Sequence, residues 1–318
     1  MAVIGWTSVF FFSLLVLVKA SDVFTDSAER IGLRFGLSEF IVGVTVVALG
    51  TSLPELISSV FSVIDGVPTM VSGNVVGSNI SNILLILGLG AFFGKRLKIS
   101  KDLVKVDLPF LVGSAFFLLV AVWDGVFGRI EALIFLFGLT VYMVYNITEK
   151  EEKTVDVVEE EIIEESGPGT FSNMTYLLFS ISLVFVFVSA KYMVDSVVVL
   201  GTLLGIGPDI IALTAVSIGT SLPEIAVSVT AAVKGNSDIA VGNILGSNIF
   251  NTFAVMGIPG MMSVLTVSDI VRSFGIPVMI MATLLYFFMT QDREITLWEG
   301  TVLLMFFLLY LVKLVSLV

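Results

Sequence analysis

The sequence predicts an all-α membrane protein whose ten transmembrane helices form two inverted five-helix repeats, with helices broken at the membrane midplane. Three observations lead to this fold class. Of the 318 residues, 57% are hydrophobic and only 14% are charged, which is too apolar for a soluble domain. Apolar segments long enough to cross ~30 Å of hydrocarbon recur along the chain. The second half of the chain also repeats the first.

The first repeat is predicted over residues 1–148 and the second over 171–318, joined by an acidic linker at 149–170. The apolar segments place the five spans of the first repeat near 2–20, 39–64, 69–93, 106–123 and 129–148. Those of the second repeat fall near 172–192, 209–233, 238–262, 273–290 and 295–317. The first and sixth spans are expected to run on past the membrane, because no strong helix breaker follows them until the glycines.

The duplication is visible without gaps. Residues 20–89 align with 189–258 at an offset of 169, with 24 identities in 70 positions. The identities gather on small, polar and helix-breaking residues in two α-repeat motifs, 41–89 and 210–258. Because five spans are an odd number, the second half must enter the membrane from the opposite side. Such inverted repeats are typical of secondary transporters, whose sites lie near the midplane.

The first shared stretch is Gly-Thr-Ser-Leu-Pro-Glu, which ends at Glu55 in one half and Glu224 in the other. A carboxylate in mid-span costs at least ~2.5–3.5 kcal/mol. Two such acids, brought together by the repeat symmetry, repel each other unless a cation or proton lies between them. Pro54 and Pro223 should kink or unwind the helices near Gly50-Thr51 and its counterpart, which frees main-chain carbonyls.

The residues around the acids indicate which cation binds. The hydroxyls of Thr51, Ser52, Thr220 and Ser221 complete an all-oxygen set, the ligands that hard cations such as Ca²⁺ and Na⁺ prefer. Two ionised glutamates balance one Ca²⁺, two Na⁺ or two protons. The chain has no His and no Cys, which excludes His/Cys zinc sites, thiolate nucleophiles and a His general base.

The second shared stretch is Gly-Asn-x-x-Gly-Ser-Asn-x-x-Asn. Its glycines are small-xxx-small pairs that let membrane helices approach closely. Its serine and last asparagine lie four residues apart on one helix face and supply further oxygens. These ligand candidates are Ser78, Asn82, Ser247 and Asn251. The asparagines off that face are predicted to form hydrogen bonds between helices: Asn74, Asn79, Asn243 and Asn248.

Lys and Arg residues set the orientation. Eleven lie in loops after odd-numbered spans and three on the opposite side. The positive-inside rule then places the 149–170 linker in the cytoplasm and both termini outside a plasma-membrane protein. Asp26 and Asp195 are equivalent in the repeat. They either line an ion approach path or serve as helix-terminal or salt-bridge residues.

The paired motifs resemble the α-repeats of the calcium/cation antiporter superfamily, and the chain looks closest to prokaryotic sodium/calcium exchangers. The resemblance implies exchange of three Na⁺ for one Ca²⁺, with the first and sixth spans sliding across a fixed core, and no enzymatic cofactor. It implies that Ca²⁺ binds Glu55 and Glu224 with the carbonyls of Thr51 and Thr220. Asn82 and Asn251 then lie beside the centre. Two flanking Na⁺ sites are implied, one from the Ala48 carbonyl with Thr51, Ser78 and Ser221, the other from the Ser217 carbonyl with Thr220, Ser52 and Ser247.

Some relatives in this superfamily, including potassium-dependent exchangers, carry Asp where this chain has Asn251, so K⁺ coupling is not expected. The transport unit is expected to be a monomer in the lipid bilayer. A proton/calcium antiporter of the same fold remains the alternative. A cation channel is favoured less, because it does not require inverted repeats, and an enzyme is disfavoured because the spans lack a catalytic set.

Overall fold

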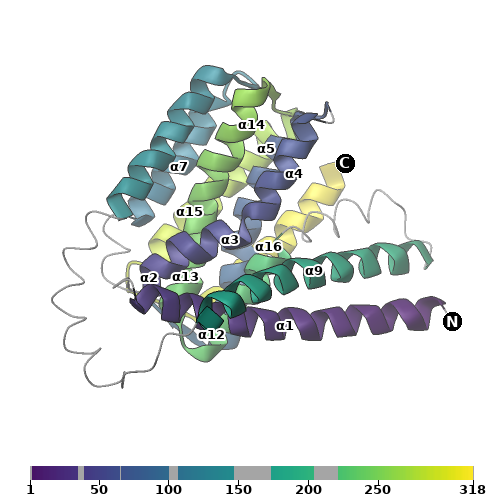
Figure 1. Cartoon of the computed structure of the whole chain (residues 1–318). Helices are drawn as coiled ribbons and strands as arrows, with labels where there is room; N and C mark the ends of the chain where they lie inside the picture. Colours follow the sequence, from purple (N-terminus) through teal and green to yellow (C-terminus); the bar gives the residue numbers. More distant parts are fainter. Residues whose placement is uncertain are drawn as a thin grey trace.

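The computed structural model describes residues 2–34, 39–64, 66–99, 107–146, 173–203 and 221–317. Two long helices, α1 (Ala2–Arg34) and α9 (Asn173–Leu203), pack against each other and cross the remaining helix bundle (Figure 1). Both continue beyond the predicted ends at 20 and 192, as the lack of breakers led us to expect. Leu17, Ala20, Val186 and Ala190 form a small apolar cluster between them, separate from the main core.

The second predicted span is a bent segment. It consists of α2 (Glu39–Val42), the π-helical turn η1 (Gly43–Val47), α3 (Ala48–Thr51) and α4 (Leu53–Ile64). The axes on either side of Ser52 differ in direction by 44°. This break at a proline is the discontinuity that the sequence predicted.

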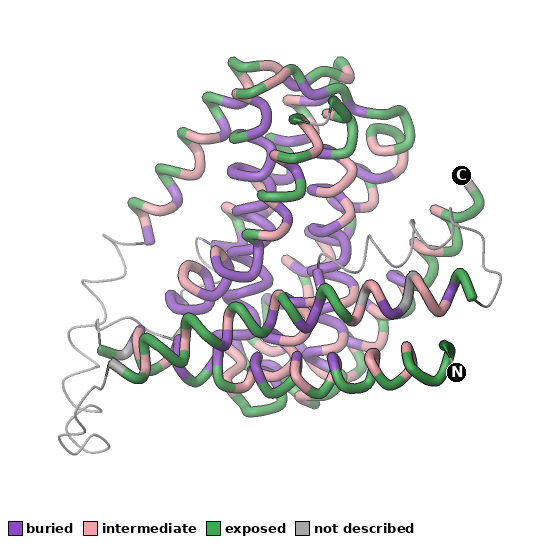
Figure 2. Tube along the Cα trace, turned by 45° about the vertical axis from the view of Figure 1, so that its right-hand side comes forward, coloured by how far each residue is buried: buried purple, intermediate pink, exposed green. Residues whose placement is uncertain are grey.

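Two straight segments form the centre of the bundle. One consists of α5 (Thr69–Ser81), η2 (Asn82–Leu87) and α6 (Gly88–Gly94). The other consists of α13 (Ser237–Phe250), η5 (Asn251–Val255) and α14 (Met256–Met262). Figure 2 shows both as mostly buried. A helix buried on all sides needs small residues where it meets its neighbours, and a Cβ on Gly246 would clash with the Val44 carbonyl of η1 and lie 2.7 Å from Ala48 Cβ.

The outer helices surround this centre and expose apolar side chains. They are α7 (Leu108–Ala121), the helix Arg129–Asn146, η6 (Val271–Gly275), α15 (Ile276–Met289) and α16 (Leu297–Leu317). On these helices Val120, Phe137 and Leu308 are 72%, 70% and 63% exposed. Large apolar residues on this scale need a lipid rather than an aqueous surrounding. A further helix, α12 (Leu222–Lys234), packs against α1 and α13, and its residues are mostly buried or half-buried.

Among the described residues, seven helices are long and apolar enough to cross a membrane, or eight if the bent segment counts as one span. The predicted span 106–123 corresponds to α7, which has only 14 residues. The predicted span 209–233 is described only from residue 221 onward, where it contains α12. The chain is therefore a multi-span helical membrane protein.

Two short antiparallel ladders were not predicted from the sequence. Strand β1 (Arg96–Lys98) pairs with β4 (Glu294–Thr296), and β2 (Val126–Phe127) pairs with β3 (Leu265–Thr266). The first ladder precedes α7 in the chain and the second contains the strand that follows α7, so the two ladders lie at opposite ends of that helix. They join loops that are almost 200 and 140 positions apart.

Candidate ion-binding site

The first half breaks its helix at Ser52, and in the second half α12 begins directly after the equivalent Ser221. Ser52 has φ −86° and ψ 2°, and Ser221 has φ −88° and ψ 5°. The helix that follows each serine makes a bond to the serine carbonyl, from Leu56 N at 3.2 Å and from Ile225 N at 3.0 Å. The sequence predicted a break near Gly50-Thr51, and the structure has it at the next residue, because Ser52 N still bonds to the Ala48 carbonyl at 3.0 Å.

The helix after each of these serines carries a glutamate in its first turn. Glu55 is the third residue of α4 and Glu224 the third of α12, and each is 1% exposed. Main-chain N–H groups at a helix start have no helical acceptor and carry partial positive charge. The helix start therefore gives each buried carboxylate a favourable local field without a basic side chain.

The two halves meet at these serines. Ser52 Oγ donates to Glu224 Oε1 at 3.2 Å, so the break of the first half contacts the acid of the second. Thr51 Oγ1 donates to Asn243 Oδ1 of α13 at 3.1 Å. Glu55 lies three residues after Ser52, so both acids lie at this junction. The structure thus brings together the two acids that the duplication placed at equivalent depth.

Asparagines hold the straight helices to the broken ones. Asn74 Nδ2 donates to Ser59 Oγ at 3.0 Å, and its counterpart Asn243 Nδ2 donates to Ser228 Oγ at 2.8 Å. Both bonds join residues of different helices, and the two bonds are related by the 169-residue offset. The predicted interhelical role of these two asparagines is confirmed.

The second asparagine pair lies between α5 and α13. Asn79 Nδ2 donates to the Asn248 carbonyl at 3.3 Å and to Thr252 Oγ1 at 3.0 Å, which confirms an interhelical role. The side chain of Asn248 instead donates to Ile244 within its own helix, at 2.9 Å. The interhelical prediction for that side chain is wrong, because a helical asparagine can reach the carbonyl one turn back.

The four ligand candidates of the second motif are all buried: Ser78 is 3% exposed, Asn82 1%, and Ser247 and Asn251 0%. Asn82 opens η2 and Asn251 opens η5, at equivalent positions of the two halves. Such π-helical turns are frequent at functional sites because they redirect side chains. Nothing in the sequence distinguished them from regular helix.

Among the described residues, the buried atoms that lack hydrogen-bond partners coincide largely with the predicted ligands. They include both carboxylate oxygens of Glu55, Oε2 of Glu224, Oγ of Ser221, and both amide atoms of Asn82 and Asn251. Ser21, Asn79, Asn248 and Tyr286 each leave one further atom unpartnered. Buried polar groups are nearly always paired, so a concentration of unpaired oxygens points to a missing partner such as a bound cation.

The remaining predicted ligands divide into two groups. Ala48 is buried, and its carbonyl accepts from Ser52 N and weakly from Thr51 Oγ1 at 3.5 Å. Ser217 and Thr220 lie outside the described residues. Within the described ranges, no three His, Cys, Asp or Glu side chains converge. What is seen of the site is therefore two carboxylates among neutral oxygens, a set suited to hard cations.

The chain matches known proteins over nearly its whole length. The family model described as sodium/calcium exchanger protein matches residues 5–148 and 174–315. Sodium/calcium exchanger MaX1 of Methanosarcina acetivorans is 34% identical over 337 residues, covering 95% of this chain and 96% of that protein. Inner membrane protein YrbG of Escherichia coli is 30% identical over 291 residues, covering 91% and 89%.

Solved structures of a sodium-calcium exchanger share the fold of this chain. The sodium-calcium exchanger NCX_Mj soaked with zero Na⁺ and Ca²⁺ superposes with a TM-score of 0.84 at 28% identity, covering 99% of this chain and 100% of that one. The same exchanger soaked with 2.5 mM Na⁺ and 0.1 mM Ca²⁺ gives a TM-score of 0.83 at 28% identity, covering 98% of each chain. The resemblance inferred from the motifs is confirmed, and the chain belongs to the sodium/calcium exchanger family.

Proposed function

We propose that this protein is a secondary antiporter that exchanges Na⁺ for Ca²⁺ across the membrane by alternating access, and is not an enzyme. The observation that carries the proposal is the meeting of Glu55 and Glu224, one from each half, with unpartnered oxygens in a buried site. Their two negative charges balance one Ca²⁺ or two Na⁺, so either ion excludes the other. Competition for one pocket is the minimum requirement of an antiporter.

The ligand assignment follows the predicted set. Ca²⁺ binds Glu55 and Glu224 with the carbonyls of Thr51 and Thr220, and Asn82 and Asn251 lie beside it. One Na⁺ site uses the Ala48 carbonyl with Thr51, Ser78 and Ser221. The other uses the Ser217 carbonyl with Thr220, Ser52 and Ser247. Burial of the ten described members and the unpartnered atoms among them support this assignment.

We also propose that the fold consists of two inverted five-span repeats, and the registers of the β1–β4 and β2–β3 ladders support this arrangement. Leu97 pairs with Ile295 in one ladder, and Thr266 pairs with Val126 in the other. Thr266 lies 169 positions after Leu97, and Val126 lies 169 positions before Ile295, so the repeat offset converts one pair into the other. Because the ladders lie at opposite ends of α7, exchanging the halves also exchanges the two ends. An in-plane two-fold axis has this property.

The proposed membrane orientation and ion coupling rest on the charged residues. The Lys and Arg distribution places the 149–170 linker in the cytoplasm of a plasma-membrane protein and both termini outside. Exchange of three Na⁺ for one Ca²⁺ moves one net charge and is electrogenic. The neutral Asn251 leaves no third acid for K⁺ among the predicted ligands, so exchange is K⁺-independent. A monomer in the bilayer contains the whole site.

The moving unit is the α1–α9 pair. It has its own apolar cluster, and it covers Gly50, two residues before the break, where an added Cβ would lie 3.4 Å from Phe24 Cζ and 3.6 Å from Leu183 Cδ1. A glycine below the pair leaves a smooth surface over which the two helices slide. Sliding exposes the carboxylates alternately to the two sides.

The test is ⁴⁵Ca²⁺ uptake into proteoliposomes loaded with Na⁺ and diluted into Na⁺-free buffer. Uptake should require internal Na⁺ and vanish in Glu55→Gln and in Glu224→Gln. Uptake driven by an imposed pH gradient and indifferent to Na⁺ would instead assign the protein to proton/calcium antiport. Uptake that needs neither gradient and persists in both variants would refute antiport, and with it the site.

A further inference from the structure

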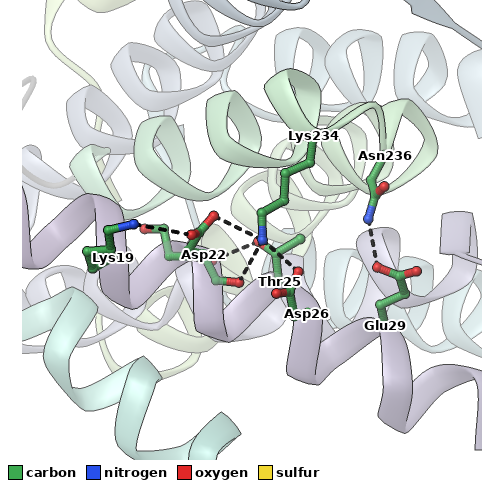
Figure 3. A network of polar contacts seen from close by, with 8 residues as sticks. Lys19, Asp22, Thr25, Asp26, Glu29, Lys234 and Asn236 are labelled. Carbon is green, nitrogen blue, oxygen red and sulfur yellow. Dashed lines mark hydrogen bonds and ion pairs between the residues drawn. The ribbon is translucent and has the colours of Figure 1, made fainter.

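A polar network joins the end of α12 to α1 (Figure 3). Lys234 Nζ, on the last residue of α12, lies 2.9 Å from Asp22 Oδ1 and 2.6 Å from Asp26 Oδ1. Asn236, two residues later, donates to Glu29 Oε2 at 2.7 Å. The three acids are spaced four and three residues apart, so they share one face of α1. Two donors of the core thus bind three acceptors of the moving pair.

The turn after α12 is built to present both donors. Gly235 ends the helix with φ 92°, a left-handed conformation that glycine adopts without strain. Lys234 and Asn236 on either side of it both reach α1, and Lys234 Nζ also bonds to the Asp22 carbonyl at 3.3 Å. The Lys234 side chain is 28% exposed. Each contact is partly screened by solvent and individually weak, but the network ties one turn to two turns of α1.

Packing holds only part of α1 near this network. Phe24 and Ala28 are buried in the main core, but a cavity of about 370 Å³ lies beside the preceding residues of α1, with Asp22 and Lys234 at its charged edge. The rest of its lining is mostly apolar and comes from α1, α6, α12 and Met193 of α9, and it includes Leu14, Leu17, Leu89, Phe93, Val229 and Thr230. The polar network therefore fixes the position of α1 at the edge of a space into which the helix has room to move.

The internal repeat supports a role for the charged pair. At the 169-residue offset, Asp22 corresponds to Lys191 and Lys234 corresponds to Asp65. Both residues of the pair differ between the two halves, but each half still has one acid and one lysine at these positions, with the signs exchanged. If the pair had no function, there would be no reason for the two charges to stay opposite after both residues changed. Asp65 itself lies outside the described residues.

We propose that the Lys234–Asp22–Asp26 contact, with Asn236–Glu29 beside it, is a latch that closes the site at this end. The latch holds α1 against the α12–α13 turn and is released each time the transporter opens toward this side. By the distribution of Lys and Arg, this side is the cytoplasm. The inference rests on the proposed alternating access. To that function the latch adds the contact that keeps the site closed toward one side of the membrane.

The first test uses the absence of cysteine from the chain. A single Thr230→Cys in the cavity reports access when inside-out vesicles meet a membrane-impermeant thiol reagent. Adding Lys234→Gln should raise the labelling rate by about 3- to 10-fold, the range for a few partly exposed charge contacts. Lys19→Gln is the matched control, since Lys19 makes one contact to Asp22 at 3.9 Å and is 79% exposed. Equal rates in the Lys234 and Lys19 variants overturn the latch.

Two further variants keep the test decisive if Lys234→Gln folds poorly. The exchange Asp22→Lys with Lys234→Asp reproduces the charge order of the other half and should restore slow labelling. Asp26→Cys with Lys234→Cys should stop exchange on oxidation and resume it on reduction. Exchange at full rate with the cross-link formed overturns the proposal.

Labelling needs no ion flux, so latch-dependent labelling with Na⁺-independent ⁴⁵Ca²⁺ uptake would refute the proposed function and leave the latch standing.

Discussion

Replacing Glu224 by Gln should weaken Ca²⁺ binding and at the same time stabilise the ion-free protein. The substitution keeps the side-chain shape and removes one of two buried carboxylates that repel each other. Loss of one partner of a buried charge contact costs about 3–5 kcal/mol, or roughly two to four orders of magnitude in Kd. Without ions, removal of the repulsion raises the free energy of unfolding.

Thermal unfolding in detergent separates these two effects. At a Ca²⁺ concentration 100 times the wild-type Kd, binding stabilises the wild type by about 2.7 kcal/mol. A 100-fold weaker site gains only about 0.4 kcal/mol at the same concentration. Glu131→Gln is the matched control, because Glu131 accepts from Gly128 N at 3.1 Å on a different helix. A Glu224→Gln protein that keeps the full Ca²⁺-dependent gain would refute the assignment of this carboxylate.

Three further outcomes follow from the same contacts. Gly246→Leu should lower the unfolding temperature by the equivalent of at least ~1–3 kcal/mol, because the new side chain would meet the main chain of η1. The control Gly113→Leu has open space around it and should leave the unfolding temperature unchanged. Equal melting temperatures for the two variants would contradict this packing. Asn243→Ala should weaken Ca²⁺ in equilibrium ⁴⁵Ca²⁺ binding by the equivalent of ~1–3 kcal/mol, because it leaves buried partners on α3 and α12 unpaired; a change below twofold would count against that role. Partial burial lowers the pKa of Lys234, but its hydrogen bonds with two aspartates outweigh burial and raise the pKa above 10.5. The contribution of Lys234 to the free energy of unfolding is therefore fully present below the ordinary lysine pKa and lost as pH rises through the raised value. The stability difference between wild type and Lys234→Gln should stay constant from about pH 6 to 9 in thermal unfolding. A difference that disappears within that window would show that Lys234 is not the group responsible.

The helix break at Ser52 and the two acids could be read from the sequence because their signals are local. A proline two residues after Ser52 removes a helical donor wherever the helix packs. A glutamate in mid-span is costly in any fold, so Glu55 and Glu224 stood out as functional. The duplication then supplied the long-range information that a single motif lacks, since it places both acids at one depth.

Other features depend on contacts that the sequence does not display. The π-helical turns at Asn82 and Asn251 replace one helical hydrogen-bond pattern with another, and only the surrounding packing selects between them. Strands β1 and β4 have three residues each and pair across almost 200 positions, so neither shows an alternating pattern. For Asp26 the sequence left a salt bridge and an ion path open, and the structure shows the salt bridge with Lys234.

Competition between Na⁺ and Ca²⁺ at equilibrium tests the shared site most directly. Purified protein is equilibrated with ⁴⁵Ca²⁺ and titrated with Na⁺, with choline as the control cation. If both ions use the pocket between Glu55 and Glu224, Na⁺ should displace Ca²⁺ completely, with a Hill coefficient above one because more than one Na⁺ replaces each Ca²⁺. Ca²⁺ that stays bound at saturating Na⁺, or that choline displaces equally well, would contradict exchange at this site.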